Sequence, residues 1–299
     1  MPGPPNATFG SSVTMVLRPL RPLPARSTAA LADAWLERLG AALADPTTDR
    51  ALLCRDTLLE LAYPQFGGNW ETAVADEALP LATRLALSAL DPRNVTLEPE
   101  YYAECDDAKF QRVKPLLWLW YSFDRLPIGG QNVELGVRLR RLLAPHIFKR
   151  CGENFKAFQH VEFSFGYNIE AGDNVVVHRH VLLDDRGGIV MGNNVSISDY
   201  ANIYSHTHSI VDQKDVTDAV TVLEDGVRIT YHATVLAGVH VGEQGMVGAM
   251  AVATKDVRGY HVYVGIPAKS VRVKPNAPPE SSRLTSVRGT GDGARDRED

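Results

Sequence analysis

Cysteine is scarce in this chain, whose 299 residues include only Cys54, Cys105 and Cys151. An odd number of scattered cysteines favours reduced thiols over a disulfide framework. The first ten residues, MPGPPNATFG, lack the charged start and apolar segment of a signal peptide. The most apolar run, Leu116–Tyr121, is far too short to span a bilayer. These absences predict a cytoplasmic protein.

Positive charge is not in excess either. The chain has 31 Lys and Arg against 36 Asp and Glu, a net charge of −5 and a pI near 6.0. Without an overall positive field, no nucleic-acid partner is expected. Hydrophobic residues make up 44% and charged residues 22%, which is ordinary for globular proteins, and the length allows two domains.

A repeat of six residues occupies Leu223–Arg258, which divides into LEDGVR, ITYHAT, VLAGVH, VGEQGM, VGAMAV and ATKDVR. The first position of each hexad is aliphatic: Leu223, Ile229, Val235, Val241, Val247 and Ala253. The fifth position is small: Val227, Ala233, Val239, Gly245, Ala251 and Val257. A helix has a period near 3.6 and a strand a period near 2.0, so this repeat fits neither. It predicts a hexapeptide β-helix, in which each hexad forms one wall of a coil and the first position points inside.

The same pattern begins earlier in the chain and is interrupted. Its earlier first positions are Phe165, Ala171, Val177, Met191, Ile197 and Ile203, and its earlier fifth positions are Ile169, Val175 and Val181. The segment LDDRGG, Leu183–Gly188, upsets the count slightly. After Thr207 the repeat is absent until Leu223, so residues 209–222 are predicted to form a loop outside the coil, where functional residues often lie. The coil is expected to close near Val262.

Helical periodicity characterises the N-terminal half. Helices are predicted at about 28–44, 49–63, 71–89, 107–124 and 133–150, with a kink or break at Pro80 and an interruption near Pro115. The first two are expected to bury Leu31, Trp35, Leu39, Leu43, Leu52, Leu53, Leu59 and Ala62. The predicted organisation is α+β, with a disordered arm at 1–26, an α-helical domain at 27–150, a β-helix at 151–275 and a disordered tail at 276–299.

The last predicted helix is basic and amphipathic. Its basic residues are Arg138, Arg140, Arg141, Lys149 and Arg150. The preferred interpretation is a helix packed on its neighbours with a solvated basic face. Peripheral contact with a membrane surface is the alternative.

Two histidines at the start of the predicted loop are candidates for catalysis. His206 and His208 follow the strand-like Ile203–Ser205. Histidine titrates nearest neutrality, so either imidazole is a candidate general base, while a surface or structural histidine is the alternative.

Residues 135–273 resemble the hexapeptide-repeat acyltransferases, in particular the galactoside, maltose and capsular-sugar O-acetyltransferases. The resemblance rests on GYNIEAGDNV, IVMGNNVSIS, IYSHTH, VLAGVHVGEQGMVGAMAVATKDV and VGIPAKSVR, which occur in the family's order. It implies a left-handed β-helix and a homotrimer with each active site between two subunits. It also implies that His208 removes the proton from an acceptor hydroxyl, which attacks the thioester of acetyl-CoA directly.

The resemblance further implies roles for other positions. On the acceptor side, it suggests His206, Tyr204 and Asp184 as substrate-binding residues, with a sugar, another small molecule or a glycan as the acceptor. The coenzyme groove would involve Tyr231, Gly238, Ala249, Thr254, Lys255 and Arg272, of which Lys255 and Arg272 suit a phosphate-rich ligand. No metal is expected. The region 67–69, the helices and the loop at 209–222 are expected to shape the acceptor pocket.

Two departures from the family pattern raise other possibilities. The family often has a tryptophan where this chain has Arg228, which changes the groove wall. The sugar acetyltransferases have an asparagine, thought to stabilise the oxyanion, at the position of His178. An imidazole N–H can donate to the same oxygen.

Three rival interpretations remain. His178, His180, His206 and His208 are numerous enough for a zinc site like that of the γ-class carbonic anhydrases, although the spacing of the close pair differs. Serine acetyltransferases also place helices before such a coil, but this chain has Asp185 where their catalytic histidine lies, and Asp184 and Asp185 are also typical of a turn. A non-catalytic scaffold is the third.

Overall fold

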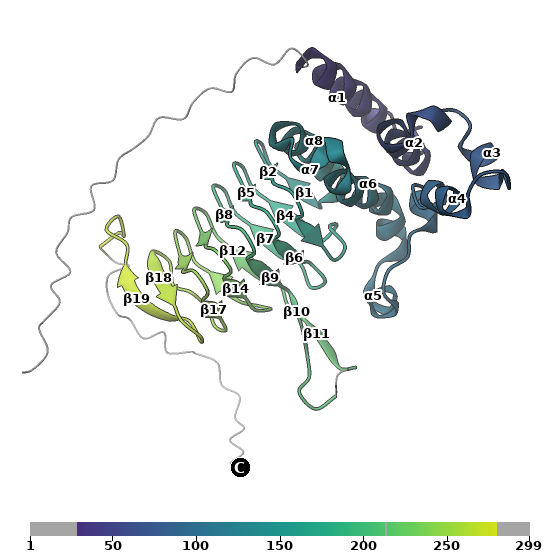
Figure 1. The fold of residues 1–299 in the computed structure, drawn as a ribbon. Helices are drawn as coiled ribbons and strands as arrows, with labels where there is room; N and C mark the ends of the chain where they lie inside the picture. Colours follow the sequence, from purple (N-terminus) through teal and green to yellow (C-terminus); the bar gives the residue numbers. More distant parts are fainter. Residues whose placement is uncertain (1–28, 213, 280–299) are drawn as a thin grey trace, which may run out of the picture.

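The computed structural model describes residues 29–212 and 214–279, in which a helical part precedes a parallel β-coil (Figure 1). The α-helices are α1 (Ala29–Ala44), α2 (Arg50–Ala62), α3 (Trp70–Ala75), α4 (Leu81–Ser88), α5 (Pro99–Glu104), α6 (Asp107–Arg125), α7 (Pro127–Gly130) and α8 (Val133–Ile147). Among the described residues, no helix combines the length and the apolar character needed to cross a bilayer.

A capping aspartate and a proline explain two of the helix boundaries. Asp49 accepts hydrogen bonds from the backbone N–H groups of Ala51 and Leu52 at the start of α2. Pro80 separates α3 from α4, which confirms the predicted break. The interruption predicted near Pro115 is wrong, because α6 continues through this buried proline and tertiary packing overrides its low helix propensity.

Three sheets, here called A, B and C, form the walls of the coil. Sheet A contains β1 (Arg150–Cys151), β4 (Ile169–Ala171), β7 (Ile189–Met191), β12 (Thr221–Leu223) and β15 (His240–Val241). Sheet B contains β2 (Lys156–Ala157), β5 (Val176–Val177), β8 (Ser196–Ile197), β13 (Arg228–Ile229), β16 (Met246–Val247), β18 (His261–Val264) and β19 (Lys269–Val273). Sheet C contains β3 (Glu162–Phe163), β6 (Leu182–Asp184), β9 (Asn202–Tyr204), β14 (Thr234–Val235) and β17 (Val252–Ala253). The chain visits A, B and C in turn, so each coil has an A–B, a B–C and a C–A corner.

The predicted repeat matches the interior of this coil. In sheet B, β5 pairs in parallel with β8, which places Val177 beside Ile197, and β8 pairs with β13, which places Ile197 beside Ile229. All three side chains have no exposed surface. At the A–B corners, Asn174 and Asn194 have φ of 57° and 58°, a left-handed conformation that asparagine tolerates better than most residues. The hexapeptide pattern therefore specifies both the inward residues and the corners.

Helices α6 and α8 cover the first coil and satisfy its backbone groups. Trp120 Nε1 donates to the carbonyl of Val161 at 3.0 Å, and the Tyr121 hydroxyl donates to the carbonyl of Phe163 at 3.1 Å. Arg140 Nη1 donates to the carbonyl of Ala157 at 3.2 Å. One hydrophobic core runs from α1 through these helices into the coil. The helical part thus caps a solenoid end that would otherwise expose unpaired strand edges.

The opposite end of the coil is closed by an antiparallel pair. Strand β19 turns back along β18, with Val262 beside Arg272 and Val264 beside Lys269. The regular repeat therefore ends near Val262, as predicted.

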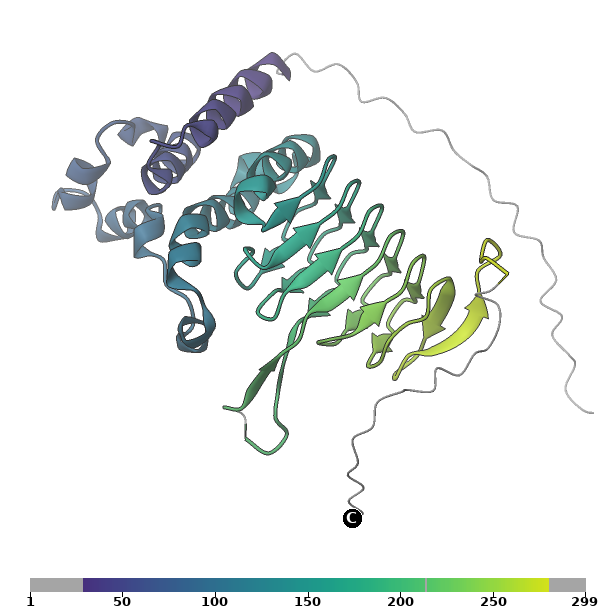
Figure 2. The ribbon, with the colours of Figure 1, turned by 180° about the vertical axis from the view of Figure 1, so that it is seen from behind.

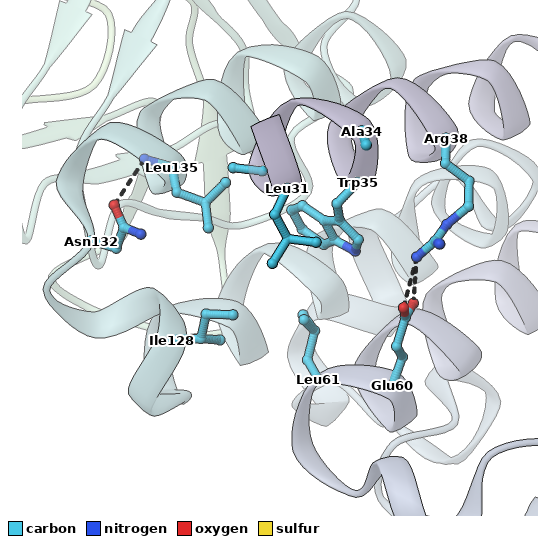
Figure 3. Close-up of a pocket in the computed structure, with 10 residues that line it drawn as sticks. Leu31, Ala34, Trp35, Arg38, Glu60, Leu61, Ile128, Asn132 and Leu135 are labelled. Atoms are coloured by element: carbon cyan, nitrogen blue, oxygen red, sulfur yellow. Dashed lines mark hydrogen bonds and ion pairs between the residues drawn. The ribbon is translucent and has the colours of Figure 1, made fainter. Parts of the chain in front are cut away.

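Several expected helix faces differ from the structure. Leu31 is 73% exposed and Leu52 is 36% exposed, so neither is buried as expected. Leu31 lies beside Trp35 at an apolar hollow of about 390 Å³ between α1, α2, α7 and α8, where Arg38 and Glu60 form an ion pair of 2.7 Å (Figure 3). Among the described residues no side chain fills this hollow, which leaves Leu31 exposed.

The basic helix also differs from expectation. It ends at Ile147, so Arg150 belongs to β1. Arg140, expected on a solvated basic face, is only 1% exposed and forms an ion pair with the buried Asp124 of α6. The pairing explains why this cation lies inside, because a buried charge is retained only with a partner.

Candidate functional site

The segment expected to be a loop is an antiparallel hairpin that leaves the coil at a C–A corner. Strands β10 (His206–His208) and β11 (Val216–Asp218) pair with His206 beside Asp218 and His208 beside Val216. Figures 1 and 2 show this hairpin projecting away from the coil. At its base, the Ser205 hydroxyl donates to the carbonyl of Asp184 at 2.6 Å and accepts from the N–H of Gly187 at 2.9 Å. These two hydrogen bonds fix the backbone directly before β10, and with it the position of His206 and His208.

Both ring nitrogens of His206 are engaged within the chain. Nδ1 contacts Asp184 Oδ2, and Nε2 contacts Arg186 Nη2. Because a guanidinium only donates, Nε2 must accept and Nδ1 must carry the proton. Asp184 is itself buried and accepts at Oδ1 from the Ser164 hydroxyl at 2.6 Å. In this conformation the ring nitrogens of His206 and the carboxylate oxygens of Asp184 bond to neighbouring side chains rather than face a substrate. The substrate-binding roles predicted for these two residues stay predictions.

Arg186 joins this network to the helical part. Its side chain is 6% exposed, and Nη1 lies 2.6 Å from Glu100 Oε1 and 3.3 Å from Glu104 Oε1. The guanidinium carbon lies 5.0 Å from the ring centroid of Tyr101. All three partners belong to α5. The pKa of Glu100 is below its usual value, chiefly because Arg186 donates a hydrogen bond to its carboxylate.

His208 lies beside this network and remains accessible. Its Nε2 is 3.5 Å from Glu100 Oε1, and its side chain is 30% exposed. The ring stands edge-on to the ring of His206, with centroids 5.2 Å apart. The ring of Tyr204 also lies near His206, with ring centroids 6.3 Å apart. Of the two neighbouring histidines, His208 is therefore the one that a substrate can reach.

Asp185 has a structural environment. It is fully buried, and its carboxylate accepts from the backbone N–H groups of Phe165 at 2.7 Å and Asn168 at 3.1 Å. Burial raises the pKa of Asp185 to about 6. With no exposed surface, Asp185 cannot take the place of the catalytic histidine of a serine acetyltransferase.

His178 lies at a B–C corner, at the opposite end of sheet C from the hairpin base. Its ring stacks on Phe158 with centroids 4.9 Å apart. Beside this pair, His180 stacks on both His160 and Tyr200, each at 4.7 Å. A single chain does not bring His178 to His208. Within residues 29–212 and 214–279, no group of three or more histidine, cysteine or acidic side chains is placed to hold a metal ion.

The expected coenzyme residues are divided between two corners and one edge. Tyr231 and Ala249 are exposed at B–C corners, whereas Thr254 and Lys255 are exposed at a C–A corner. Arg272 is exposed on β19. Gly238, also at a C–A corner, has φ of 75°, and a Cβ there would lie 3.0 Å from the Cβ of Ala219. The turn itself therefore requires this glycine.

Sequence reasoning missed Arg186 and α5. The only signal for Arg186 is the disturbed count at Leu183–Gly188, which does not by itself indicate a role for this arginine. Gly67 and Gly68, expected near the acceptor, line a hollow with Trp70 and Glu71. The helical residues that contact the hairpin base come from α5 instead.

The fold and these residues can be compared with known proteins. No protein-family profile matches the chain. In architecture it is a left-handed parallel β-helix preceded by helices, and a solved maltose O-acetyltransferase from Clostridium difficile shares this fold. That structure has 23% identity and a TM-score of 0.50 over 56% of this chain and 87% of its own.

Two further similarities carry names of acetyltransferases. Galactoside O-acetyltransferase from Escherichia coli is 26% identical over 140 residues, which are 46% of this chain and 69% of that protein. A hexapeptide-repeat acetyltransferase from Vibrio cholerae, solved with acetyl coenzyme A, has 22% identity and a TM-score of 0.48 over 56% of this chain and 87% of its own. The similarity to galactoside O-acetyltransferase and the fold shared with the maltose O-acetyltransferase confirm the predicted resemblance to the hexapeptide-repeat acetyltransferases.

Proposed function

We propose that this protein is a CoA-dependent O-acyltransferase that transfers an acetyl group from acetyl-CoA to a hydroxyl of a sugar, another small molecule or a glycan. The observation that carries the proposal is an accessible imidazole, His208, held beside a buried network at the base of a hairpin that leaves a hexapeptide coil. The similarity to galactoside O-acetyltransferase supports the same activity.

The proposed reaction is a direct acyl transfer. His208 removes the proton from the acceptor hydroxyl, because an alcohol is a poor nucleophile until it loses that proton. The acceptor oxygen then bonds to the acyl carbonyl carbon and the carbon–sulfur bond breaks. The coenzyme thiolate takes up the proton that His208 carried, which regenerates the base.

A homotrimer is part of the proposal, because the candidate residues lie on different corners of one chain. His178, Tyr231 and Ala249 are at B–C corners, whereas His208 and Lys255 are at C–A corners. A second copy with its B–C corners against the first copy's C–A corners would complete the set. His178 would then donate a hydrogen bond to the oxyanion across the interface.

The direct test is the release of free CoA from acetyl-CoA by the purified protein in the presence of sugars and simple alcohols. Release that depends on the acceptor, with the acetyl ester identified by mass spectrometry, supports the proposal. No release with any acceptor would refute it.

Replacing both Lys255 and Arg272 by alanine is expected to raise KM for acetyl-CoA more than it lowers kcat. These cations would bind phosphates remote from the reacting carbon, so they contribute equally to the ground and transition states. Steady-state kinetics at a fixed acceptor concentration measure the effect. Lys269→Ala, which removes another exposed cation of β19, is the control. An unchanged KM in the double variant would place the coenzyme elsewhere.

The variant His178→Asn separates acyl transfer from the zinc alternative. It should retain substantial activity, because an amide N–H₂ can donate to an oxyanion in place of the imidazole. A zinc site would instead lose its metal, because an amide is a much poorer zinc ligand. Elemental analysis and CoA release on both proteins decide. Stoichiometric zinc that disappears in the variant, together with carbon dioxide hydration by the wild type, would contradict the proposed function.

A further inference from the structure

Glu100 extends the candidate site from the coil into the helical part of the chain. Its Oε1 lies 2.6 Å from Arg186 Nη1 and 3.5 Å from His208 Nε2. The side chain is 42% exposed, so solvent and small molecules can reach it. Both ribbon views place α5 on the same side of the molecule as the hairpin (Figures 1 and 2). A carboxylate is thus fixed beside the histidine proposed to take the acceptor's proton.

Arg186 holds this carboxylate in place. Besides Glu100, the guanidinium contacts Glu104 at 3.3 Å and Asp184 at 3.4 Å, and it lies over the ring of Tyr101. One guanidinium therefore faces three acidic side chains. Within the described part of the chain, Glu100 Oε2 makes no hydrogen bond, although a carboxylate can accept several. The cluster of Glu100, Glu104, Asp184 and Arg186 therefore has more acidic than basic groups. Its exposed side presents Glu100 Oε2 as an acceptor.

We propose that Glu100 determines acceptor specificity by accepting a hydrogen bond from a second donor next to the reacting hydroxyl. The proposal rests on the acyltransferase function. His208 Nε2 lies 3.5 Å from Glu100 Oε1, and the open Oε2 belongs to the same carboxylate. Two donors on adjacent carbons of one small molecule can therefore reach His208 and Oε2 together. The acceptor class is then a vicinal diol or a vicinal amino alcohol.

The protein would discriminate between acceptors with and without a second donor because leaving the Glu100 carboxylate unpaired costs free energy. A hydrogen bond to a charged group is stronger than a neutral one, and an acceptor without the second donor displaces water from Glu100 without replacing it. Because the side chain is partly exposed, we expect a preference of about 10- to 100-fold rather than the larger factors of fully buried sites.

Three acceptors of one shape test this preference: cyclohexanol, cis-1,2-cyclohexanediol and cis-2-aminocyclohexanol. Wild-type protein with acetyl-CoA should show kcat/KM at least about tenfold higher for the diol or the amino alcohol than for cyclohexanol. The more strongly preferred of the two identifies the donor as a hydroxyl or an ammonium group.

Glu100→Gln should reduce this preference to less than about threefold, because kcat/KM falls more for the diol and the amino alcohol than for cyclohexanol. Arg186 would hold the amide oxygen, so that the N–H₂ group faces the acceptor. This group cannot pair with an ammonium group and can give a hydroxyl only a neutral hydrogen bond in place of the charge-assisted one. Glu98→Gln is the matched control, because this exposed glutamate directly precedes α5. If Glu100→Gln lowers the melting temperature, Glu100→Asp is used, which keeps the negative charge but shortens the side chain by one methylene group and so withdraws the carboxylate from the acceptor.

Two results would overturn the inference. Wild-type protein that acetylates all three acceptors equally has no second-donor recognition. A Glu100→Gln variant that loses the same factor on every acceptor would show that Glu100 acts through His208 instead. Failure of the proposed function looks different, since no acceptor would then release CoA.

Discussion

His208→Ala is expected to reduce acyl transfer by about 10²- to 10⁴-fold, because the acceptor hydroxyl loses its general base. The melting temperature and the oligomeric state should stay close to those of the wild type. His208 lies on the projecting hairpin rather than in the interior of the coil, and its side chain is 30% exposed. CoA release, thermal melting and light scattering on the same preparation measure the three properties.

A second histidine provides the control for this variant. His240 is exposed on sheet A, where it lies beside Val222 and contacts Glu224 at 2.8 Å. His240→Ala should retain wild-type activity. If His208→Ala keeps most of its activity, another group removes the proton and the proposed mechanism is wrong.

Arg140→Met is expected to lower the free energy of unfolding by about 3–5 kcal/mol. Arg140 and Asp124 are 1% and 2% exposed, so the variant leaves a buried carboxylate without its counter-charge. Asp124 also accepts from the backbone N–H of His160 at 2.7 Å, and Arg140 donates to the carbonyl of Ala157. The pair therefore joins α6 and α8 to the first coil. Urea unfolding followed by circular dichroism measures the loss.

A double variant tests whether the unpaired charge causes this loss. Asp124→Asn combined with Arg140→Met removes both charges and should be more stable than Arg140→Met alone. Arg141→Met is the control on the same helix. Arg141 donates from Nε to the carbonyl of Phe155 at 2.9 Å, so its loss should cost only about 1 kcal/mol. Additive losses in the double variant would mean that the two side chains contribute independently.

The coil could be predicted closely from the sequence because each hexad specifies its own interior position. Val177, Ile197 and Ile229 are inward in the repeat and fully buried in the structure. Their neighbours along the sheet are equivalent positions of adjacent coils, so the period alone fixes the register. The helical part lacks such a rule. The location of Arg140 depended on Asp124, which lies in a different helix, and helical periodicity does not reveal a charged partner of this kind.

The candidate site could be predicted only in part for a similar reason. The residue pattern alone placed His206 and His208 at the start of the loop without separating them, and only the family resemblance singled out His208. The structural difference between them comes from Asp184 and Arg186 one coil earlier. Glu100 had no sequence signal, since the six residues of α5 are too few to show a period. The hairpin was expected as a loop because its short strands do not continue the repeat.

The contacts of α6 and α8 with the first coil also determine whether the coil can be separated from the helical part and joined to another chain. The carbonyl groups of Phe155, Ala157, Val161 and Phe163 receive their donors from helical side chains. The coil is therefore not an interchangeable module that can be exchanged between chains at residue 150. A fragment beginning there would present an open edge able to recruit further strands, which is the geometry of a growing fibril. Recombination that preserves folding has to move these two helices together with the coil.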